Sequence, residues 1–232
     1  MDSDTAPAPS PSVLTHLYPN AVLRCFREGI SGVRRVATLY VTGDWDRPTP
    51  CRGWTATDLA GHLSATADEG LATLRTLGAT GEPTRMLGEE ELAEHNAKTL
   101  VMLPAQTGPR HISGFGRHAE QYADLVSTMP TGLVAAEYGE RTFTLTEVLG
   151  SLAVEWHVHA WDLATTIGAD YRPSCPELLA SIFTAAMPYL SLGSGTPWAA
   201  VLRGTGRRVD DGGRPPGRST REVVRDRTRA LP

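Results

Sequence analysis

The sequence predicts an all-α fold, an antiparallel four-helix bundle with additional short helices and a Gly/Pro/Arg-rich C-terminal tail. Three observations predict it. Apolar residues recur at helical spacing in four long segments, two of these segments open with a capping box, and Gly or Pro follows their ends. With 232 residues and 41% hydrophobic content, the chain suffices for one globular domain. We expect a disordered N-terminus (1–12), a bundle domain (13–192) and a C-terminal extension (193–232).

The first two long helices are expected over residues 13–40 and 55–77. In the first, apolar residues repeat near helical spacing, at Val22, Phe26, Ile30, Val33 and Leu39. The segment "GDWDRPTPCRGW" then breaks the pattern with prolines and glycines. Thr55 as N-cap, with Asp58 three residues later, forms a capping box that fixes the start of the second helix. "GATGEP" ends it.

Two further helices are expected in the middle of the chain. "GEEELAEHNAKTLVML" (88–103) predicts a shorter helix, and "ISGFGRHAEQYADLVSTM" (112–129) predicts another that ends before Pro130. The pattern around Gly139 is typical of either a loop or a small hairpin.

The fourth long helix is expected to begin after Thr144, because Thr144 and Glu147 form a second capping box, and to end at Ile167. A further helix is expected from Pro176 to about Leu192. In the extension that follows, "AVLRGTGRRV" (200–209) predicts a small hairpin, and the rest predicts a surface tail.

Composition excludes several classes of function. A net charge of −4 and a pI near 6.0 argue against a nucleic-acid partner, which normally contacts a basic face. The first residues lack the features of a signal peptide, and no apolar run approaches the roughly 18 residues that span a bilayer. We expect a cytoplasmic protein without a membrane partner. The cysteines (Cys25, Cys51 and Cys175) form no CxxC pair, which favours reduced thiols over a disulfide framework.

The stretch "EWHVHAWD" in the fourth long helix carries the main candidate site. Glu155 and His159 lie one turn apart and about 40° apart around the helix axis, and Asp162 falls within about 20° of Glu155. His157 points to the opposite side, where we expect solvent. The pair of Glu155 and His159 has two interpretations: a hydrogen bond that fixes the helix, or two ligands of a metal ion.

A third ligand is available on the second helix. His62 lies between Leu59 and Leu63, near the predicted buried face, and alone it is typical of a core histidine. If the two helices are neighbours in the bundle, His62, Glu155 and His159 converge. Two imidazoles and one carboxylate match the ligand set of catalytic zinc sites, which leave a position open.

Two segments together resemble a known family. "TPCRGWTATDLAGHL" (49–63) and "EWHVHAWDLATTIG" (155–168) are similar to the hallmark segments of the mycothiol-dependent maleylpyruvate isomerase N-terminal domain family, in the DinB-like superfamily. The resemblance implies a DinB-like bundle that holds a divalent metal, usually zinc, on His62, Glu155 and His159. It implies that Asp162 orients a ligand or packs the helix end.

The resemblance also implies a reaction class. Family members use mycothiol for thiol transfer or thiol-assisted isomerisation, so the partners would be a small-molecule thiol and an electrophilic substrate. Residues 193–232 do not match the C-terminal domain of the isomerase, which favours a metal-dependent thiol S-transferase, in detoxification or natural-product biosynthesis. The alternatives are a metal-dependent isomerase, lyase, hydrolase or cyclase without thiol, and a non-catalytic metal-binding stress protein. A monomer and a homodimer are both compatible with the sequence.

Other reactive residues are weaker candidates. His118 and Asp162 are candidates for a catalytic role beyond the metal ligands. His111 and His118 lie seven residues apart and either face the pocket, as acid/base or substrate contacts, or lie on the surface. Cys51 precedes a helix N-terminus, where a cysteine can act as a nucleophile, but packing in the turn is the preferred explanation. Cys25 and Cys175 are expected to be inert. The arginines of the tail either hold an anionic substrate or are solvated.

Overall fold

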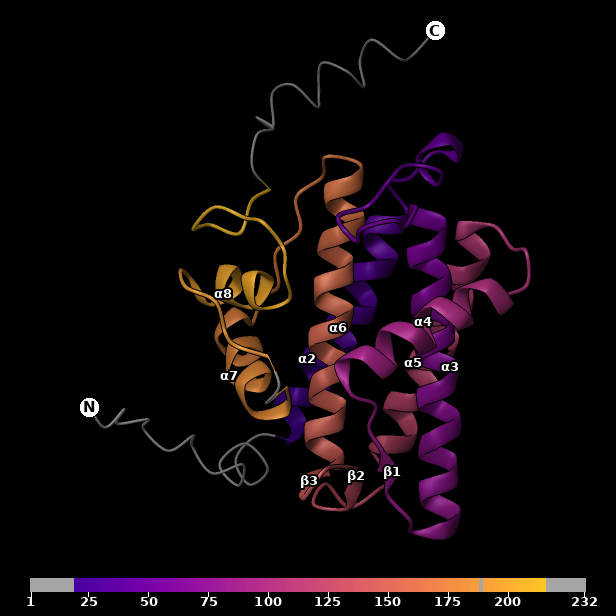
Figure 1. The fold of residues 1–232 in the computed structure, drawn as a ribbon, viewed down its shortest axis with the longest axis vertical. Helices are drawn as coiled ribbons and strands as arrows, with labels where there is room; N and C mark the ends of the chain where they lie inside the picture. Colours follow the sequence, from indigo (N-terminus) through magenta and orange to yellow (C-terminus); the bar gives the residue numbers. More distant parts are fainter. Residues whose placement is uncertain (1–18, 188–189, 216–232) are drawn as a thin grey trace, which may run out of the picture.

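The computed structural model describes residues 19–187 and 190–215, and it confirms the predicted all-α bundle. Four long helices form the bundle (Figure 1), namely α2 (Pro19–Ala37), α3 (Ala56–Thr80), α5 (Gly108–Val126) and α6 (Leu145–Thr166). The expected disordered N-terminus, the start of the first predicted helix and residues 216–232 of the tail lie outside the described residues. Among the described residues, no helix combines the length and the hydropathy that a membrane span requires.

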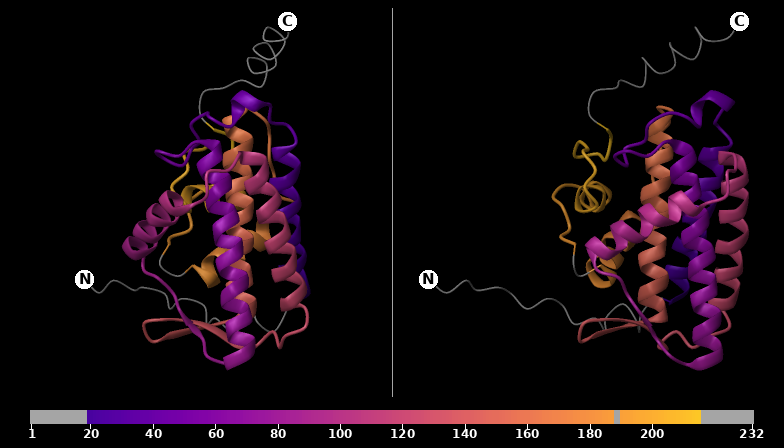
Figure 2. Two further views of the ribbon diagram at one scale, coloured as in Figure 1. Left: turned by 90° about the vertical axis from the view of Figure 1, so that its right-hand side faces the viewer. Right: turned by 45° about the vertical axis from the view of Figure 1, so that its right-hand side comes forward.

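The four helices run as two parallel pairs, and each pair is antiparallel to the other (Figures 1 and 2). Helices α2 and α6 run side by side in the same direction, while α3 and α5 run the opposite way. The parallel pair α3 and α5 needs a long connection, which contains α4 (Glu89–Met102). Figure 2 shows that this helix runs obliquely to the bundle axis, with one end away from the bundle. The short 3₁₀ helix η1 (Thr42–Asp44) lies in the connection between α2 and α3.

A small sheet covers one end of the bundle, at the bottom of Figure 1. It consists of β1 (Thr84–Arg85), β2 (Val134–Tyr138) and β3 (Arg141–Thr144), in the order β1-β2-β3. Strands β2 and β3 are antiparallel and turn at Gly139, which has a φ of 60°. Of the two structures expected around Gly139, the hairpin is therefore the one that forms.

Both predicted capping boxes are present, and they fix the two helices that carry the candidate ligands. The Thr55 hydroxyl accepts a hydrogen bond from the Asp58 backbone N–H at 3.2 Å, and Asp58 accepts from the Thr55 N–H at 2.8 Å. At the start of α6, Glu147 accepts from the Thr144 N–H at 2.8 Å. Each box satisfies N–H groups that the first turn of a helix leaves free, so α3 and α6 begin at defined residues.

Two expected helix boundaries differ from the structure by four residues or more, and one expected element is of the wrong type. Helix α5 begins at Gly108 rather than at 112, with a proline in its first turn, where the missing N–H costs nothing. Helix α7 (Pro176–Ala186) ends before 192. The predicted hairpin over 200–209 does not form, because Trp198, Val201 and Leu202 have helical spacing and bury one face of α8 (Pro197–Gly204).

The contact between α2 and α6 requires a residue without a side chain at Gly29. A Cβ atom added there would lie 2.8 Å from Trp156 Cβ and 3.3 Å from His157 Cδ2. Both helices are buried at this point, and Trp156 also packs edge-on against Phe26 and Phe115. Neither helix can move away without opening the core.

We expect Gly29→Ala to lower the free energy of unfolding by about 1–3 kcal/mol, because the added methyl group overpacks this contact. Gly78→Ala is the matched control, since Gly78 also lies in a helix but a Cβ there approaches only Met129, at 3.7 Å. That change is expected to stabilise the protein by about 0.5–1 kcal/mol through helix propensity. Urea unfolding of both variants measures the difference. Equal stability of the two variants would contradict the described packing.

Candidate metal centre

The three predicted ligands meet at the seam between α3 and α6. His62 lies near the start of α3, and Glu155 and His159 lie one turn apart near the end of α6. Nε2 of His62 and Nε2 of His159 are each 3.0 Å from the same atom, Oε1 of Glu155. The two imidazole rings stand nearly perpendicular, with centroids 5.2 Å apart. The convergence expected from helix phase is therefore present.

The tautomer of His159 determines what faces Glu155. Nδ1 of His159 lies 2.9 Å from Oδ2 of Asp162, a carboxylate that also accepts from Arg207, so this nitrogen donates to Asp162. In a neutral imidazole, Nε2 then carries a lone pair, and this lone pair points at an acceptor oxygen 3.0 Å away. Such a contact is repulsive unless a proton or a metal cation lies between the two atoms. The proton can belong to an imidazolium or to a neutral carboxyl group.

Burial and neighbouring charge act in opposite directions on this group. Burial raises the pKa of Glu155, but the attraction of His159 and hydrogen bonds from His159 and His62 outweigh it and hold the pKa well below its usual value. Burial lowers the pKa of His159, and the charge of Glu155 with the hydrogen bond to Asp162 raises it well above its usual value. The site therefore favours a carboxylate with positive charge beside it.

A buried ion pair lies behind the candidate metal site. Asp162 has no exposed surface, and Arg207 donates to it at 2.6 Å from Nη2 and at 3.2 Å from Nε. The Cys51 thiol donates to the same carboxylate at 3.3 Å. Burial raises the pKa of Asp162, and the hydrogen bond from His159 and the charge of Arg207 bring it below its usual value. Asp162 therefore stays ionised and keeps the Nδ1 proton of His159 in place.

The donor set fits a divalent metal ion. Two imidazole nitrogens and one carboxylate oxygen lie within 4.8 Å of one another, which suits zinc and leaves a coordination position free. The hydrogen bond from His159 to Asp162 reproduces the carboxylate–histidine pairing that orients metal ligands. The side of the site toward solvent is open at Glu155, whose side chain keeps 31% of its surface exposed, against 6% and 7% for His62 and His159.

Comparison with known proteins places the chain in a family. The family model of the mycothiol maleylpyruvate isomerase N-terminal domain matches residues 26–164, which include all three candidate ligands. The chain belongs to this family. The all-α DinB-like fold predicted from the sequence is consistent with it. A comparison with curated proteins finds no match.

Two solved structures share the fold. A crystal structure of the mycothiol-dependent maleylpyruvate isomerase has a TM-score of 0.64 and 19% sequence identity, over 86% of this chain and 95% of that chain. A histidine-to-alanine mutant of that isomerase gives a TM-score of 0.64 and 18% identity, over 85% of this chain and 92% of that chain. The likeness in fold therefore extends beyond residue 164, where the match to the family model ends.

The expectation that His157 faces solvent is wrong. His157 has no exposed surface. Its Nε2 donates to the carbonyl oxygen of Cys25 at 2.9 Å, and the Tyr171 hydroxyl donates to Nδ1 at 2.6 Å. Burial lowers the pKa of His157, in keeping with a neutral ring. The phase was right, since His157 points away from the three candidate ligands, but α2 covers that face of α6.

Of the remaining candidate residues, Cys51 lies at the site, whereas His118 and His111 contact other residues. His118 on α5 faces Asp68 of α3, with Nδ1 3.4 Å from Oδ1, and contacts none of the three ligands. His111 is buried beside Gly61, where its Nε2 would lie 3.7 Å from an added Cβ, and burial lowers its pKa. Cys51 belongs to the site, with Sγ 3.9 Å from Nδ1 of His159.

Arg207 is the site residue that sequence reasoning did not single out. It follows α8 in the segment predicted as a hairpin and tail, and it reaches Asp162 across 45 positions of the chain. Its Nη2 also lies 3.3 Å from Cys51 Sγ. A carboxylate buried at Asp162 needs a cation beside it, and this need was the one sign in the sequence that an arginine would reach the site. Which of the many arginines supplies it depends on the tertiary fold.

We expect Arg207→Ala to lower the free energy of unfolding by about 3 kcal/mol, because it leaves the buried Asp162 carboxylate without its cation. The control is Arg27→Ala, which breaks an ion pair with Asp124 between side chains that are 44% and 74% exposed. Its expected cost is about 0–1 kcal/mol. Urea unfolding of both variants measures these changes, and equal costs would contradict a structural role of the Asp162–Arg207 pair.

Proposed function

We propose that this protein is a metal-dependent enzyme that activates a mycothiol-type thiol for attack on an electrophilic small molecule, and that it acts as a thiol S-transferase. The observation that carries the proposal is the meeting of His62 Nε2, His159 Nε2 and Glu155 Oε1 in a member of this family. The partly exposed side chain of Glu155 supports access for a substrate from solvent.

In this proposal His62, Glu155 and His159 hold the metal through the atoms that now face one another. A divalent metal supplies positive charge that lowers the pKa of a thiol, so that a thiolate is available at neutral pH. Asp162 keeps the proton on Nδ1 of His159, which leaves Nε2 as the ligand atom. Arg207 neutralises Asp162 and holds it in place. The nucleophile belongs to the cosubstrate, and the chain binds and orients it.

Thiol-assisted isomerisation is the second candidate function. It is favoured by the extent of the structural match, which covers 92% and 95% of the two isomerase chains and includes more than the N-terminal domain. Both reactions begin with the same attack of a thiolate on an electrophilic carbon. They differ in the product, since the transferase keeps the carbon–sulfur bond and the isomerase releases the thiol unchanged.

We expect His62→Ala and His159→Ala to reduce the metal content of the purified protein at least about tenfold, because each change removes a ligand. Thiol-dependent consumption of an electrophile should be lost with the metal. Elemental analysis and an assay of thiol and electrophile consumption, with mycothiol added or omitted, measure both effects.

Two histidine variants are the controls. His95→Ala removes a 42% exposed histidine on α4, and His157→Ala removes a buried one that faces away from the site. Both should keep the metal, although His157→Ala should lower stability. Turnover that is unaffected by mycothiol would contradict the thiol-dependent function and favour activation of water or a carbonyl group. Metal without turnover of any electrophile would favour a metal-binding stress protein.

A further inference from the structure

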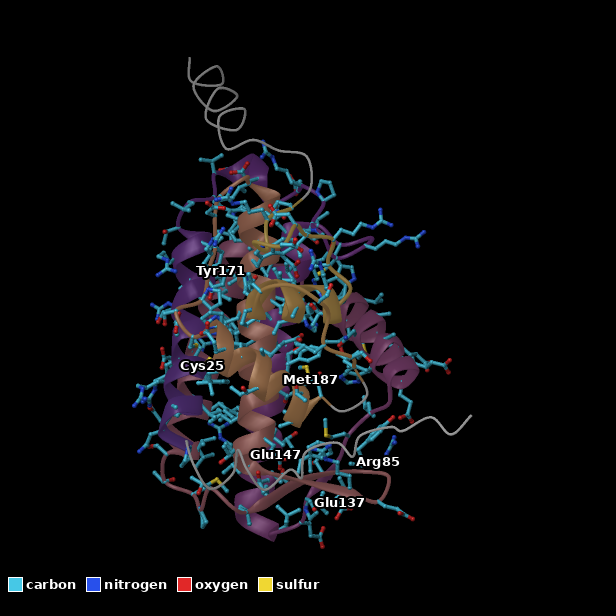
Figure 3. The ribbon with its side chains drawn as sticks, turned by 90° about the vertical axis from the view of Figure 1, so that its left-hand side faces the viewer. Cys25, Arg85, Glu137, Glu147, Tyr171 and Met187 are labelled. Atoms are coloured by element: carbon cyan, nitrogen blue, oxygen red, sulfur yellow. The ribbon has the colours of Figure 1, made fainter. Side chains whose placement is uncertain are left out.

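Two cysteines that the metal centre does not use lie side by side near the face of α6 that carries His157. Cys25 of α2 and Cys175, the N-cap of α7, place their sulfur atoms 3.0 Å apart. Cys25 and Tyr171 are labelled in Figure 3, which shows the side of the molecule where α7 lies. A disulfide bond is about 2.0 Å long, so a shift of about 1 Å brings the two atoms to bonding distance. The sequence alone predicted neither this proximity nor any role for the two residues.

The two thiols differ in access to solvent. Cys25 is 2% exposed, whereas Cys175 is half-buried at the start of α7. The hydrogen bond with Cys175 and burial raise the pKa of the Cys25 thiol. Glu28 accepts from the Cys175 thiol at 3.5 Å and from the Ser174 N–H at 2.6 Å, which fixes the backbone before α7. A reagent from solvent therefore reaches Cys175 first.

The surroundings hold Cys25 in place for a second step. His157 Nε2, which donates to the Cys25 carbonyl oxygen, lies 3.6 Å from the Cys25 sulfur. The ring of His157 is itself held by Tyr171. Both groups are buried, so the Cys25 sulfur has little freedom to move away from Cys175.

We infer that Cys25 and Cys175 form a reversible disulfide that fastens the start of α7 to α2. The oxidant is a low-molecular-weight disulfide, RSSR. The Cys175 sulfur attacks one sulfur of RSSR, which forms a mixed disulfide and releases one RSH. The Cys25 sulfur then attacks the Cys175 sulfur and releases the second RSH. The two cysteine thiols lose two electrons and two protons, which RSSR gains.

The disulfide would add a second covalent link between the bundle and the C-terminal helices α7 and α8. Helix α7 packs on α6 and α8, and the segment after α8 carries Arg207, which contacts Asp162 behind the metal centre. In the reduced protein, the chain connection after α6 and noncovalent packing hold these helices on the bundle. In the oxidised protein, a link between residues 150 positions apart adds to it.

The test uses the full-length protein in buffers of reduced and oxidised glutathione, followed by alkylation and peptide mass spectrometry. Oxidised glutathione should produce a cross-linked peptide pair containing Cys25 and Cys175, which dithiothreitol reverses, while Cys51 stays outside the cross-link. The midpoint of thermal unfolding should rise by roughly 10 °C, as expected for a cross-link that closes a long loop.

Two variants test the order of the steps. Cys25→Ser should stop at a glutathione adduct on Cys175, whereas Cys175→Ser should leave the buried Cys25 unmodified. Free thiols at both positions in oxidised glutathione, or a glutathione adduct on Cys175 of the unaltered protein that Cys25 does not displace, would overturn the inference. Neither readout depends on the metal or on catalysis, so the result is independent of the proposed function.

Discussion

Two imidazole nitrogens and one carboxylate oxygen meet inside the helical bundle, and positive charge between them stabilises this contact. His62 and His159 both direct Nε2 at Oε1 of Glu155 at 3.0 Å, and Asp162 fixes the proton of His159 on its other nitrogen. Without a cation, the free energy lost by removing these groups from water is not compensated. This arrangement is therefore weak as a purely structural device and well suited to a metal ion.

The fold supports this arrangement from several directions. The capping boxes at Thr55 and Thr144 fix the starts of the two helices that supply the ligands. The pairing of α2 with α6 through Gly29 places the other face of α6 toward α3. Arg207 then brings the C-terminal segment onto the bundle, so that the part of the chain beyond the family domain contributes to the charge balance of the site.

Helix phase was enough to predict that His62, Glu155 and His159 converge, because the position of each follows from its apolar neighbours along two helices. Their assignment as metal ligands rested on the resemblance to the family and stays a prediction. The same reasoning failed for His157, since a helix covered by α2 on one side and α3 on the other has no solvent face there. Arg207 and the approach of Cys25 to Cys175 join residues far apart in sequence. Such contacts depend on loop paths and packing, which local periodicity does not determine.

X-ray absorption at the metal edge of the purified protein, recorded before and after addition of mycothiol, tests the proposed metal site most directly. We expect about one zinc ion per chain, bound by nitrogen and oxygen atoms, and a new zinc–sulfur distance of about 2.3 Å once the thiol is present. The spectrum of His159→Ala provides the matched reference. A protein without bound metal, or metal whose spectrum does not change when the thiol is added, would contradict activation of the thiol by this metal site.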